Sequence, residues 1–382
     1  MKTKAFRISV VAVAFLLGIG LVWLLSKAGD KVRGPLEDLF SFTEETVNSV
    51  EKNLILDQRK DKRANKLKWI QGYVKNAERL KDPGKILFGA YDNNTVKTFE
   101  NIINLEDSLQ TTFPLIHIYA AWGDKPEQKF PVNQVNGIVE LGSIPVITWE
   151  PWLTDFDITL HPELPLREKR EKGGMTDVAK GLYDFYIAEW AQQAKKIKSS
   201  IMLRVGHEMN DPYRYPWGPH NNKPKDFIAA WQHIHDVFRQ QDVDNIVWVW
   251  SPHPAYGMFK DFYPGDTYVD FVGSGVLNYG TAATWSKWWS FREIFGNYYK
   301  QLSAFKKPIV ISEFGSLAVG GDRGQWYANA LDSLPMKYPT VKSVIFFHYS
   351  DDRTTTQQPL NWYLTDDKGT LTLIRQKLKG FQ

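Results

Sequence analysis

From Lys85 to the end of the chain, short apolar runs alternate with longer segments of amphipathic pattern. Strands that alternate with helices pair in parallel through right-handed crossovers. Eight such units over about 290 residues predict a (β/α)8 TIM barrel. The expected strands are Ile86–Tyr91, Phe113–Tyr119, Ile144–Glu150, Ile201–Gly206, Ile246–Ser251, Asp270–Gly275, Pro308–Glu313 and Ser343–His348. The expected helices are Val96–Gln110, Val132–Leu141, Asp177–Lys198, Pro224–Gln240, Trp285–Lys306 and Arg323–Leu334.

A doubly wound open sheet is the alternative for such a rhythm. That fold usually carries a glycine-rich phosphate-binding turn after its first strand. Here the first strand runs into Gly89-Ala90-Tyr91-Asp92, which does not have this pattern. The barrel is therefore the preferred prediction.

The N-terminus contains a strongly apolar segment. Ile8–Leu25 has 18 residues without a charge, between Arg7 and Lys27. This length is close to that of a bilayer-spanning helix and long for the apolar part of a signal peptide, so we expect an uncleaved membrane anchor. Ser26-Lys27-Ala28 resembles a small-x-small cleavage site, which leaves a cleaved secretion signal open. Either outcome places the rest of the chain outside the cytoplasm, in the periplasm or the extracellular space.

The segment from Pro35 to Leu80 is rich in charges and has regularly spaced apolar residues. This pattern predicts one or two amphipathic helices that form a stalk or cover the bottom of the barrel. Asp82-Pro83-Gly84 ends it. We therefore expect a membrane segment in residues 1–30, a helical stalk in residues 31–82 and the barrel domain in residues 83–382.

Composition excludes several kinds of site. The chain has no cysteine, which rules out disulfides, thiolate metal sites and a cysteine nucleophile. A formal net charge of +4 is too small to indicate nucleic-acid binding. His233 and His235 lie two apart in a helical pattern and so do not share a face. We expect no metal and no cofactor.

Two glutamates stand where apolar strands are expected to open into loops. Glu208 follows the fourth strand and Glu313 ends the seventh. In this fold, chemistry takes place at the carboxyl ends of the strands. Two carboxylates facing one cavity are what glycosidic bond cleavage requires, one protonated as an acid and one ionised. The alternative for each glutamate is a helix cap or an ion pair.

Aromatic residues are unusually frequent, with 15 Trp, 17 Tyr and 22 Phe. Tryptophan and tyrosine present flat amphipathic faces that suit sugar rings. Several of them follow expected strand ends, which predicts a stacking groove for an extended saccharide. They are Trp149, Trp152, Tyr213, Tyr215, Trp217, Tyr279, Trp285, Trp288 and Trp289.

Two segments of the sequence resemble regions of one enzyme family. RVGHEMNDPYRYPWG, at residues 204–218, is similar to the acid/base region of glycoside hydrolase family 26, and KPIVISEFG, at residues 307–315, to its nucleophile region. The strings ITWEPW and VWVWSPHP extend the resemblance, which covers residues 85–375. The family contains β-mannanases and endo-β-1,3-1,4-glucanases, and it retains anomeric configuration. Other barrel glycosidases share the placement of the two carboxylates.

The resemblance implies roles for particular residues. Glu208 would be the general acid/base and Glu313 the nucleophile, with Arg204, His207 and Asn278 in support. Residues implied to bind substrate are Trp149, Glu150, Trp152, Asn210, Trp217, Tyr279 and Trp285.

The sequence departs from the family pattern at two strands. Related enzymes tend to have a tyrosine before the asparagine of the sixth strand, where it contacts the nucleophile; here Leu277 precedes Asn278, and Tyr279 is a possible replacement. At the eighth strand, where a tryptophan platform is common, the chain has Phe346-Phe347-His348-Tyr349.

The predicted function is a retaining, endo-acting hydrolase of a β-linked polysaccharide. The HEMN and ITWEP strings favour β-glucan, such as mixed-linkage β-1,3-1,4-glucan, slightly over β-mannan. Two alternatives remain: a membrane-anchored binding or editing subunit of an exopolysaccharide synthesis or export system, and a transglycosylase that uses the same residues. Membrane contact through residues 8–25 and a polysaccharide synthase complex are the other expected partners.

Overall fold

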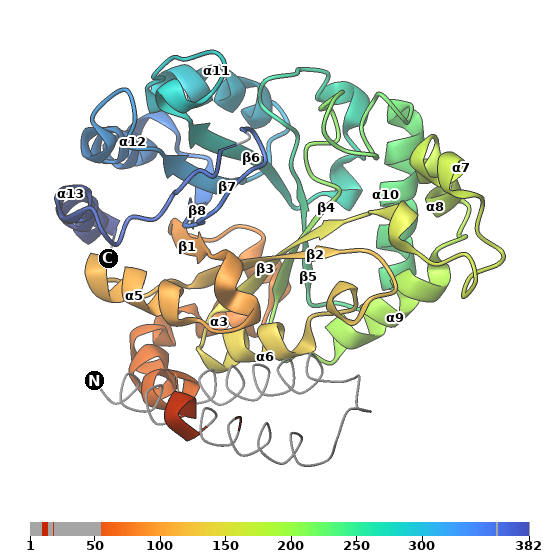
Figure 1. Ribbon diagram of the computed structural model, residues 1–382, viewed down its shortest axis with the longest axis horizontal. Helices are drawn as coiled ribbons and strands as arrows, with labels where there is room; N and C mark the ends of the chain where they lie inside the picture. The colour runs from red at the N-terminus through yellow and green to blue at the C-terminus, as the bar shows by residue number, and fades with distance from the viewer. Residues whose placement is uncertain (1–9, 14–17, 19–54, 357, 382) are drawn as a thin grey trace.

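Eight parallel strands form a closed barrel in the computed structural model, which describes residues 10–13, 18, 55–356 and 358–381. Each strand pairs with the next, and β8 pairs with β1. The predicted barrel is confirmed, and Figure 1 shows its strands inside a ring of helices. The strands are β1 (Leu87–Tyr91), β2 (Leu115–Ala121), β3 (Ile144–Glu150), β4 (Ile201–Val205), β5 (Ile246–Trp250), β6 (Phe271–Asn278), β7 (Ile309–Ser316) and β8 (Val341–Phe347).

Helices follow the strands along the chain. The α-helices are α3 (Gln71–Val74), α4 (Ala77–Leu80), α5 (Glu100–Leu109), α6 (Val132–Glu140), α7 (Arg167–Glu171), α8 (Gly174–Ala179), α9 (Asp184–Lys195), α10 (Pro224–Gln240), α11 (Phe291–Ser303), α12 (Arg323–Lys337) and α13 (Lys368–Leu378). Short 3-10 helices are η1 (Lys68–Ile70), η2 (Asn93–Val96), η3 (Pro126–Gln128), η4 (Leu153–Asp155), η5 (Lys260–Phe262), η6 (Asp266–Tyr268), η7 (Gly280–Ala282) and η8 (Lys379–Phe381).

Two predicted helices differ from the observed ones for local reasons. The helix expected over Asp177–Lys198 is broken into α8 and α9, because Gly181 adopts φ +84° between them. The helix expected from Trp285 begins only at Phe291. There Ser290 caps it, and Glu293 completes the capping box by accepting the Ser290 N–H at 2.8 Å.

Alternation along the strands divides the apolar residues into two sets. Successive side chains on a strand point to opposite faces, so one set fills the barrel and the other packs against the helices. On β7, for example, the Phe314 ring lies 5.2 Å from both the Trp326 and Tyr327 rings of α12. Its neighbour Glu313 is left on the interior face, which places a carboxylate at the barrel mouth.

Residues 55–80 cover the amino ends of the strands. After a helix over residues 55–66, η1, α3 and α4 bring an apolar set against the lower barrel interior. Ser200 fixes this cover at the start of β4, since its N–H donates to the Val74 carbonyl at 2.8 Å and its hydroxyl to the Tyr73 carbonyl at 2.7 Å. The cover residues are Leu67, Ile70, Val74, Ala77 and Leu80. The part of the predicted stalk that the structure describes therefore lies opposite the barrel mouth.

The predicted membrane segment, residues 8–25, lies mostly outside the described residues. Residues 10–13 and 18 within it are helical. Among the residues that the structure describes, no helix has both the length and the apolar character needed to span a bilayer.

Arg63 joins the covering helix to the barrel by a buried ion pair with Glu106 on α5. Both side chains are 4% exposed. Arg63 also donates to the Leu141 carbonyl at 2.9 Å and to the Ser143 hydroxyl at 2.6 Å. Removing one partner of such a pair leaves a buried charge without compensation.

We expect Arg63→Met to lower the free energy of unfolding by about 3–5 kcal/mol, measured by urea denaturation. The double variant Arg63→Met/Glu106→Leu should recover part of this loss, because no charge is then left buried. Lys60→Met is the control: its exposed pair with Asp57 is worth about 0–1 kcal/mol. Equal effects of Arg63→Met and Lys60→Met would contradict a stabilising role for the buried pair.

Candidate active site

A cavity of about 300 Å³ opens at the carboxyl ends of β4 to β7. Both predicted catalytic glutamates, Glu208 and Glu313, line it. The rest of its wall combines aromatic side chains with a few charged ones. The other lining residues are Arg214, His253, Pro254, Ala255, Gly275, Leu277, Tyr279, Trp285, Trp289, Glu293, Ile294 and Tyr298. This mixture of apolar walls and convergent polar groups is typical of a small-molecule or saccharide site.

Glu313 lies on β7 between two hydrogen-bond donors. Arg204, fully buried on β4, donates to Oε1 at 2.8 Å, and the Tyr119 hydroxyl of β2 donates to the same oxygen at 2.9 Å. Burial alone would raise the pKa of Glu313. The charge of Arg204 and these hydrogen bonds outweigh burial and hold the pKa below its ordinary value. Glu313 is therefore the ionised carboxylate of the site.

Glu208 follows β4 in a left-handed backbone conformation, with φ +54°. This conformation is uncommon for a residue other than glycine and is found mostly where surrounding contacts hold it. One such contact is the Glu208 N–H, which donates to the Ser251 carbonyl at the end of β5 at 2.7 Å. Burial raises the pKa of Glu208 above its ordinary value, and the charge of Glu313 adds to the rise. Glu208 is therefore suited to hold a proton.

Gly275 on β6 keeps the space between the two carboxylates open. A Cβ at this position would lie 3.5 Å from Glu313 Oε2 and 3.9 Å from Glu208 Oε1. The pairing of β6 with β7 shifts by one residue between Ser274 and Gly275. The absent side chain and this irregularity leave an open space between the two acids.

A third carboxylate, Glu150, ends β3, the strand that pairs with β4. Burial raises the pKa of Glu150 to about 7, against a hydrogen bond from Trp152 Nε1 at 3.1 Å. His207 Nδ1 lies 3.9 Å from Glu150 Oε1, and His207 Nε2 lies 3.0 Å from the Tyr215 hydroxyl. Burial lowers the pKa of His207 well below its usual range, so the imidazole is neutral.

Two tryptophans predicted to bind substrate, Trp149 and Trp217, are buried and do not line the cavity. Trp149 is 0% exposed and stacks on Trp190 of α9 at 4.4 Å, because it points outward from β3 while Glu150 points inward. Trp217 is buried beneath Tyr215, with the rings 4.6 Å apart, and donates to the His207 carbonyl at 2.8 Å. The structure thus places both tryptophans in the supporting core.

The two asparagines hold loops in place. Asn210 accepts the His253 N–H at 2.7 Å and donates to the His253 and Gly257 carbonyls, each at 2.9 Å. Asn278 donates to the Ser316 hydroxyl at 3.0 Å and accepts the Trp289 N–H at 3.2 Å. Both side chains are buried, so their contribution is to join neighbouring loops at the barrel mouth.

Three of the four aromatic residues predicted after the sixth strand, Tyr279, Trp285 and Trp289, line the cavity. Tyr279 and Trp285 line it with their rings 5.7 Å apart and nearly perpendicular, and Trp285 is 50% exposed. Leu277 also lines the cavity. The hydroxyl contact with Glu313 that the resemblance places at the position of Leu277, with Tyr279 as a possible replacement, is made by Tyr119 on β2.

Three polar residues near the acids were missed in the sequence. Tyr119 is the last residue of an expected strand, where polar side chains point into the site, so this signal was available. His253 lies in the VWVWSPHP string just after the fifth strand. Arg214 stands between two tyrosines in the loop after β4, and no sequence pattern indicates its direction.

Comparison with known proteins finds one matching family and several relatives. Residues 174–339 match the model of glycosyl hydrolase family 26. The chain is also 31% identical over 273 residues to Endoglucanase H of Acetivibrio thermocellus. The family match agrees with the resemblance that the sequence motifs indicate. A second member of the comparison, a mannan endo-1,4-beta-mannosidase of Bacillus subtilis, is 27% identical over 174 residues.

The matches to these two relatives cover only part of each protein. The match to Endoglucanase H spans 69% of this chain and 27% of the relative, and the match to the mannosidase spans 44% and 43%. This chain therefore spans less than half the length of either relative.

Solved structures of family 26 proteins share the fold. A Bacillus subtilis mannanase superposes with a TM-score of 0.55 at 18% identity, covering 80% of this chain and 89% of the mannanase. A Muricauda protein named GH26C gives a TM-score of 0.58 at 14% identity, covering 82% and 94%. At these identities the likeness concerns the barrel alone.

The free energy of unfolding can test the placement of Trp149 in the core and of Trp285 at the cavity wall. We expect Trp149→Ala to cost about 3–5 kcal/mol of unfolding free energy, because it opens a cavity in the core. Trp285→Ala, at the half-exposed cavity wall, should change it by no more than about 0.5 kcal/mol. Urea denaturation followed by circular dichroism measures both. A larger loss for Trp285→Ala than for Trp149→Ala would contradict the placement.

Proposed function

We propose that this protein hydrolyses a β-linked polysaccharide within the chain and with retention of configuration, using Glu313 as nucleophile and Glu208 as acid/base. The observation that carries this is the opposite direction of the two pKa shifts across one open space. Glu313 is held ionised by Arg204 and Tyr119, whereas burial keeps a proton on Glu208. Retaining glycosidases need this division, with the carboxyl groups about 5–5.5 Å apart.

The mechanism that we propose is a double displacement at the two acids. In the first step Glu313 attacks the anomeric carbon while Glu208 gives its proton to the leaving oxygen, so that a glycosyl ester forms and the glycosidic bond breaks. In the second step Glu208, now ionised, takes a proton from water, whose oxygen displaces Glu313 from the anomeric carbon. Trp285 and Tyr279 would stack on sugar rings at the cavity wall.

For the substrate we propose a β-glucan before a β-mannan. The relative named as an endoglucanase matches 69% of this chain at 31% identity, whereas the one named as a mannosidase matches 44% at 27%. The test is product analysis by mass spectrometry with mixed-linkage β-glucan, cellulose, mannan, glucomannan, xylan and β-1,3-glucan. We expect oligosaccharides from mixed-linkage β-glucan, and none with Glu313→Ala. Products from mannan alone would overturn the substrate, and none from any glycan would overturn the function.

We further propose that residues 8–25 tether the enzyme to a membrane with the barrel on the extracytoplasmic side. The covering residues 55–80 lie at the amino ends of the strands, opposite the cavity, so a tether entering there would leave the mouth free for a polymer. Cell fractionation tests this. The full chain should sediment with membranes, and a variant that starts at Gly29 should not. Equal distribution of both would contradict the tether.

The hydroxyl of Tyr119 provides a test of how Glu313 is kept ionised. Its hydrogen bond favours the charged form, so Tyr119→Phe should raise the pKa of Glu313. The acidic limb of the kcat/KM profile should then move to higher pH by about one to two units, because a hydrogen bond to a charged group is worth about 1.5–3 kcal/mol.

The matched control for this substitution is Tyr91→Phe. The Tyr91 ring lies 4.9 Å from that of Tyr119, but Tyr91 does not donate to Glu313 among the hydrogen bonds of the described residues. The acidic limb of the Tyr91→Phe profile should stay where it is in the wild type. Profiles that coincide for Tyr119→Phe and the wild type would show that the Tyr119 hydroxyl does not help to keep Glu313 ionised.

A further inference from the structure

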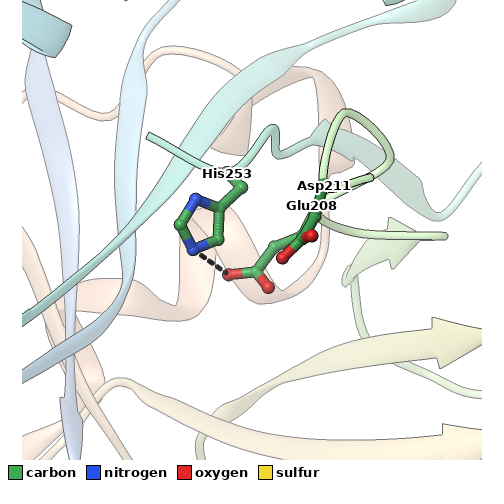
Figure 2. A group of neighbouring side chains, drawn as sticks. All are labelled: Glu208, Asp211 and His253. Atoms are coloured by element: carbon green, nitrogen blue, oxygen red, sulfur yellow. Dashed lines mark ion pairs between the residues drawn. The ribbon is translucent and has the colours of Figure 1, made fainter. Parts of the chain in front are cut away.

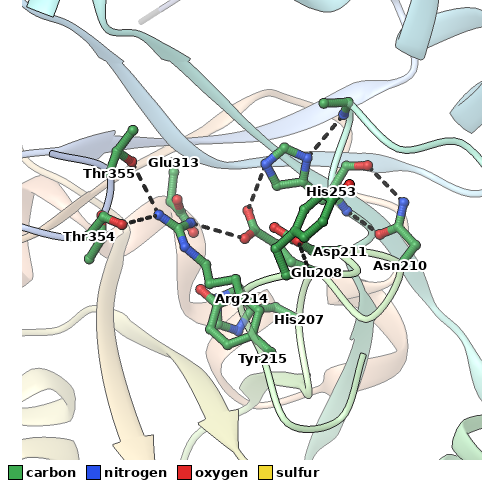
Figure 3. A network of polar contacts seen from close by, with 12 residues as sticks. His207, Glu208, Asn210, Asp211, Arg214, Tyr215, His253, Glu313, Thr354 and Thr355 are labelled. Carbon is green, nitrogen blue, oxygen red and sulfur yellow. Dashed lines mark hydrogen bonds and ion pairs between the residues drawn. The ribbon is translucent and has the colours of Figure 1, made fainter. Parts of the chain in front are cut away.

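Each carboxylate oxygen of Glu208 faces a basic side chain from a different loop. Arg214 Nη1 lies 3.4 Å from Oε2, and His253 Nε2 lies 4.0 Å from Oε1 (Figure 3). Arg214 belongs to the loop after β4 and His253 to the loop after β5. The acid/base of the proposed mechanism is therefore held from two sides.

The proton on His253 can be assigned from its backbone contacts. Its Nδ1 accepts the Ala255 N–H at 3.0 Å, so in the neutral ring the proton sits on Nε2, the atom that faces Glu208. The Asn210 side chain fixes the His253 backbone from both sides, through its N–H and its carbonyl. His253 is thus oriented to donate toward Glu208.

This orientation also decides between two roles for the cluster in Figure 2. Glu208, Asp211 and His253 offer three atoms within 4.8 Å of one another, an arrangement that could hold a metal ion. A metal would need the lone pair of His253 Nε2, and that nitrogen carries the proton. Asp211 already accepts the Tyr213 N–H at 2.8 Å. The cluster is therefore better suited to orient a carboxylate than to bind a metal.

Arg214 is held in place from across the barrel mouth. Its Nη2 donates to the Thr354 carbonyl at 3.0 Å and to the Thr355 hydroxyl at 3.2 Å, both in the loop after β8. Its guanidinium carbon lies 5.8 Å from the centre of the Tyr215 ring. These contacts leave Nη1 directed at Glu208, as Figure 3 shows.

We propose that Arg214, assisted by His253, is a positioning residue that orients the ionised Glu208 for the second step of the reaction. The inference rests on the proposed function of Glu208. When Glu208 has given its proton to the leaving group, its new negative charge lies between these two donors. It is then held ready to take a proton from the water that cleaves the ester to Glu313.

The pH dependence follows from the charged groups around Glu208. Arg214 and Arg204 favour its ionised form, as does His253 when protonated, whereas burial and Glu313 oppose it. Removing the Arg214 charge therefore raises the pKa of Glu208, and the basic limb of activity moves to higher pH. The titratable or charged groups near Glu208 are Glu150, Arg204, Asp211, Arg214, Tyr215, His253, Tyr256 and Glu313.

The test compares Arg214→Met and Arg214→Lys with the wild type. In Arg214→Met we expect the basic limb of the kcat/KM profile on the natural glycan to move to higher pH by about one unit. On an aryl glycoside with an activated leaving group, kcat near neutral pH should fall about tenfold, with a larger burst, because the second step becomes limiting. Arg214→Lys keeps the charge and should restore the basic limb toward its wild-type position.

Two controls separate this from a general effect of charge. Arg353→Met removes an arginine of the loop after β8 whose guanidinium lies 2.9 Å from Asp351, and it should leave the limb in place. Glu150 has a pKa of about 7, so the shift must also appear in a Glu150→Gln background. A basic limb that is the same in Arg214→Met and the wild type would overturn the inference. If Glu208→Ala keeps full activity on the natural glycan, the proposed function itself fails.

Discussion

The buried pair of Arg204 and Glu313 is the interaction on which the site depends. Arg204 is fully buried on β4, and its charge is compensated across the barrel interior by Glu313 on β7, 2.8 Å away. A buried cation without such a partner is strongly unfavourable, so each charge fixes the other. The pair joins β4 to β7, two strands that are not neighbours in the barrel. It also keeps Glu313 ionised near neutral pH.

The properties of the other acid follow from this pair. Because Glu313 stays ionised nearby, a second negative charge in the same buried space is disfavoured, and Glu208 keeps its proton. Gly275 leaves the gap between them open, and the strained backbone at Glu208 points its carboxyl group into that gap. The ion pair of Arg204 with Glu313 and the absence of a side chain at Gly275 thus give two glutamates different roles. Glu208 holds a proton, and Glu313 is ionised.

The sequence predicts the barrel and the positions of both glutamates well, because each depends on local pattern. The alternation of strands and helices is a property of consecutive residues, and strand ends locate the chemistry in this fold. Trp149 could have been assigned correctly too. Neighbours on a strand face opposite ways, so an inward Glu150 requires an outward Trp149. Asn210 and Trp217 are harder, since loop residues have no such period.

Contacts between distant strands are what the sequence does not reveal. The family pattern led us to look for a tyrosine on β6, and Leu277 stands there, but Tyr119 of β2 reaches the same carboxylate. Arg214 meets Glu208 only because the loop after β8 holds it from the far side of the mouth. Such contacts depend on closure of the whole barrel and not on residue spacing.

The central claim is that Glu313 forms a covalent bond with the sugar. The most direct test is to incubate the protein with a 2-deoxy-2-fluoro glycoside of a cleaved glycan, which slows release of the ester, and to map the adduct by peptide mass spectrometry. The account predicts one added glycosyl mass on the peptide that contains Glu313, and none in Glu313→Ala. An adduct on Glu208 or Glu150, or products of inverted configuration with no adduct at all, would contradict it.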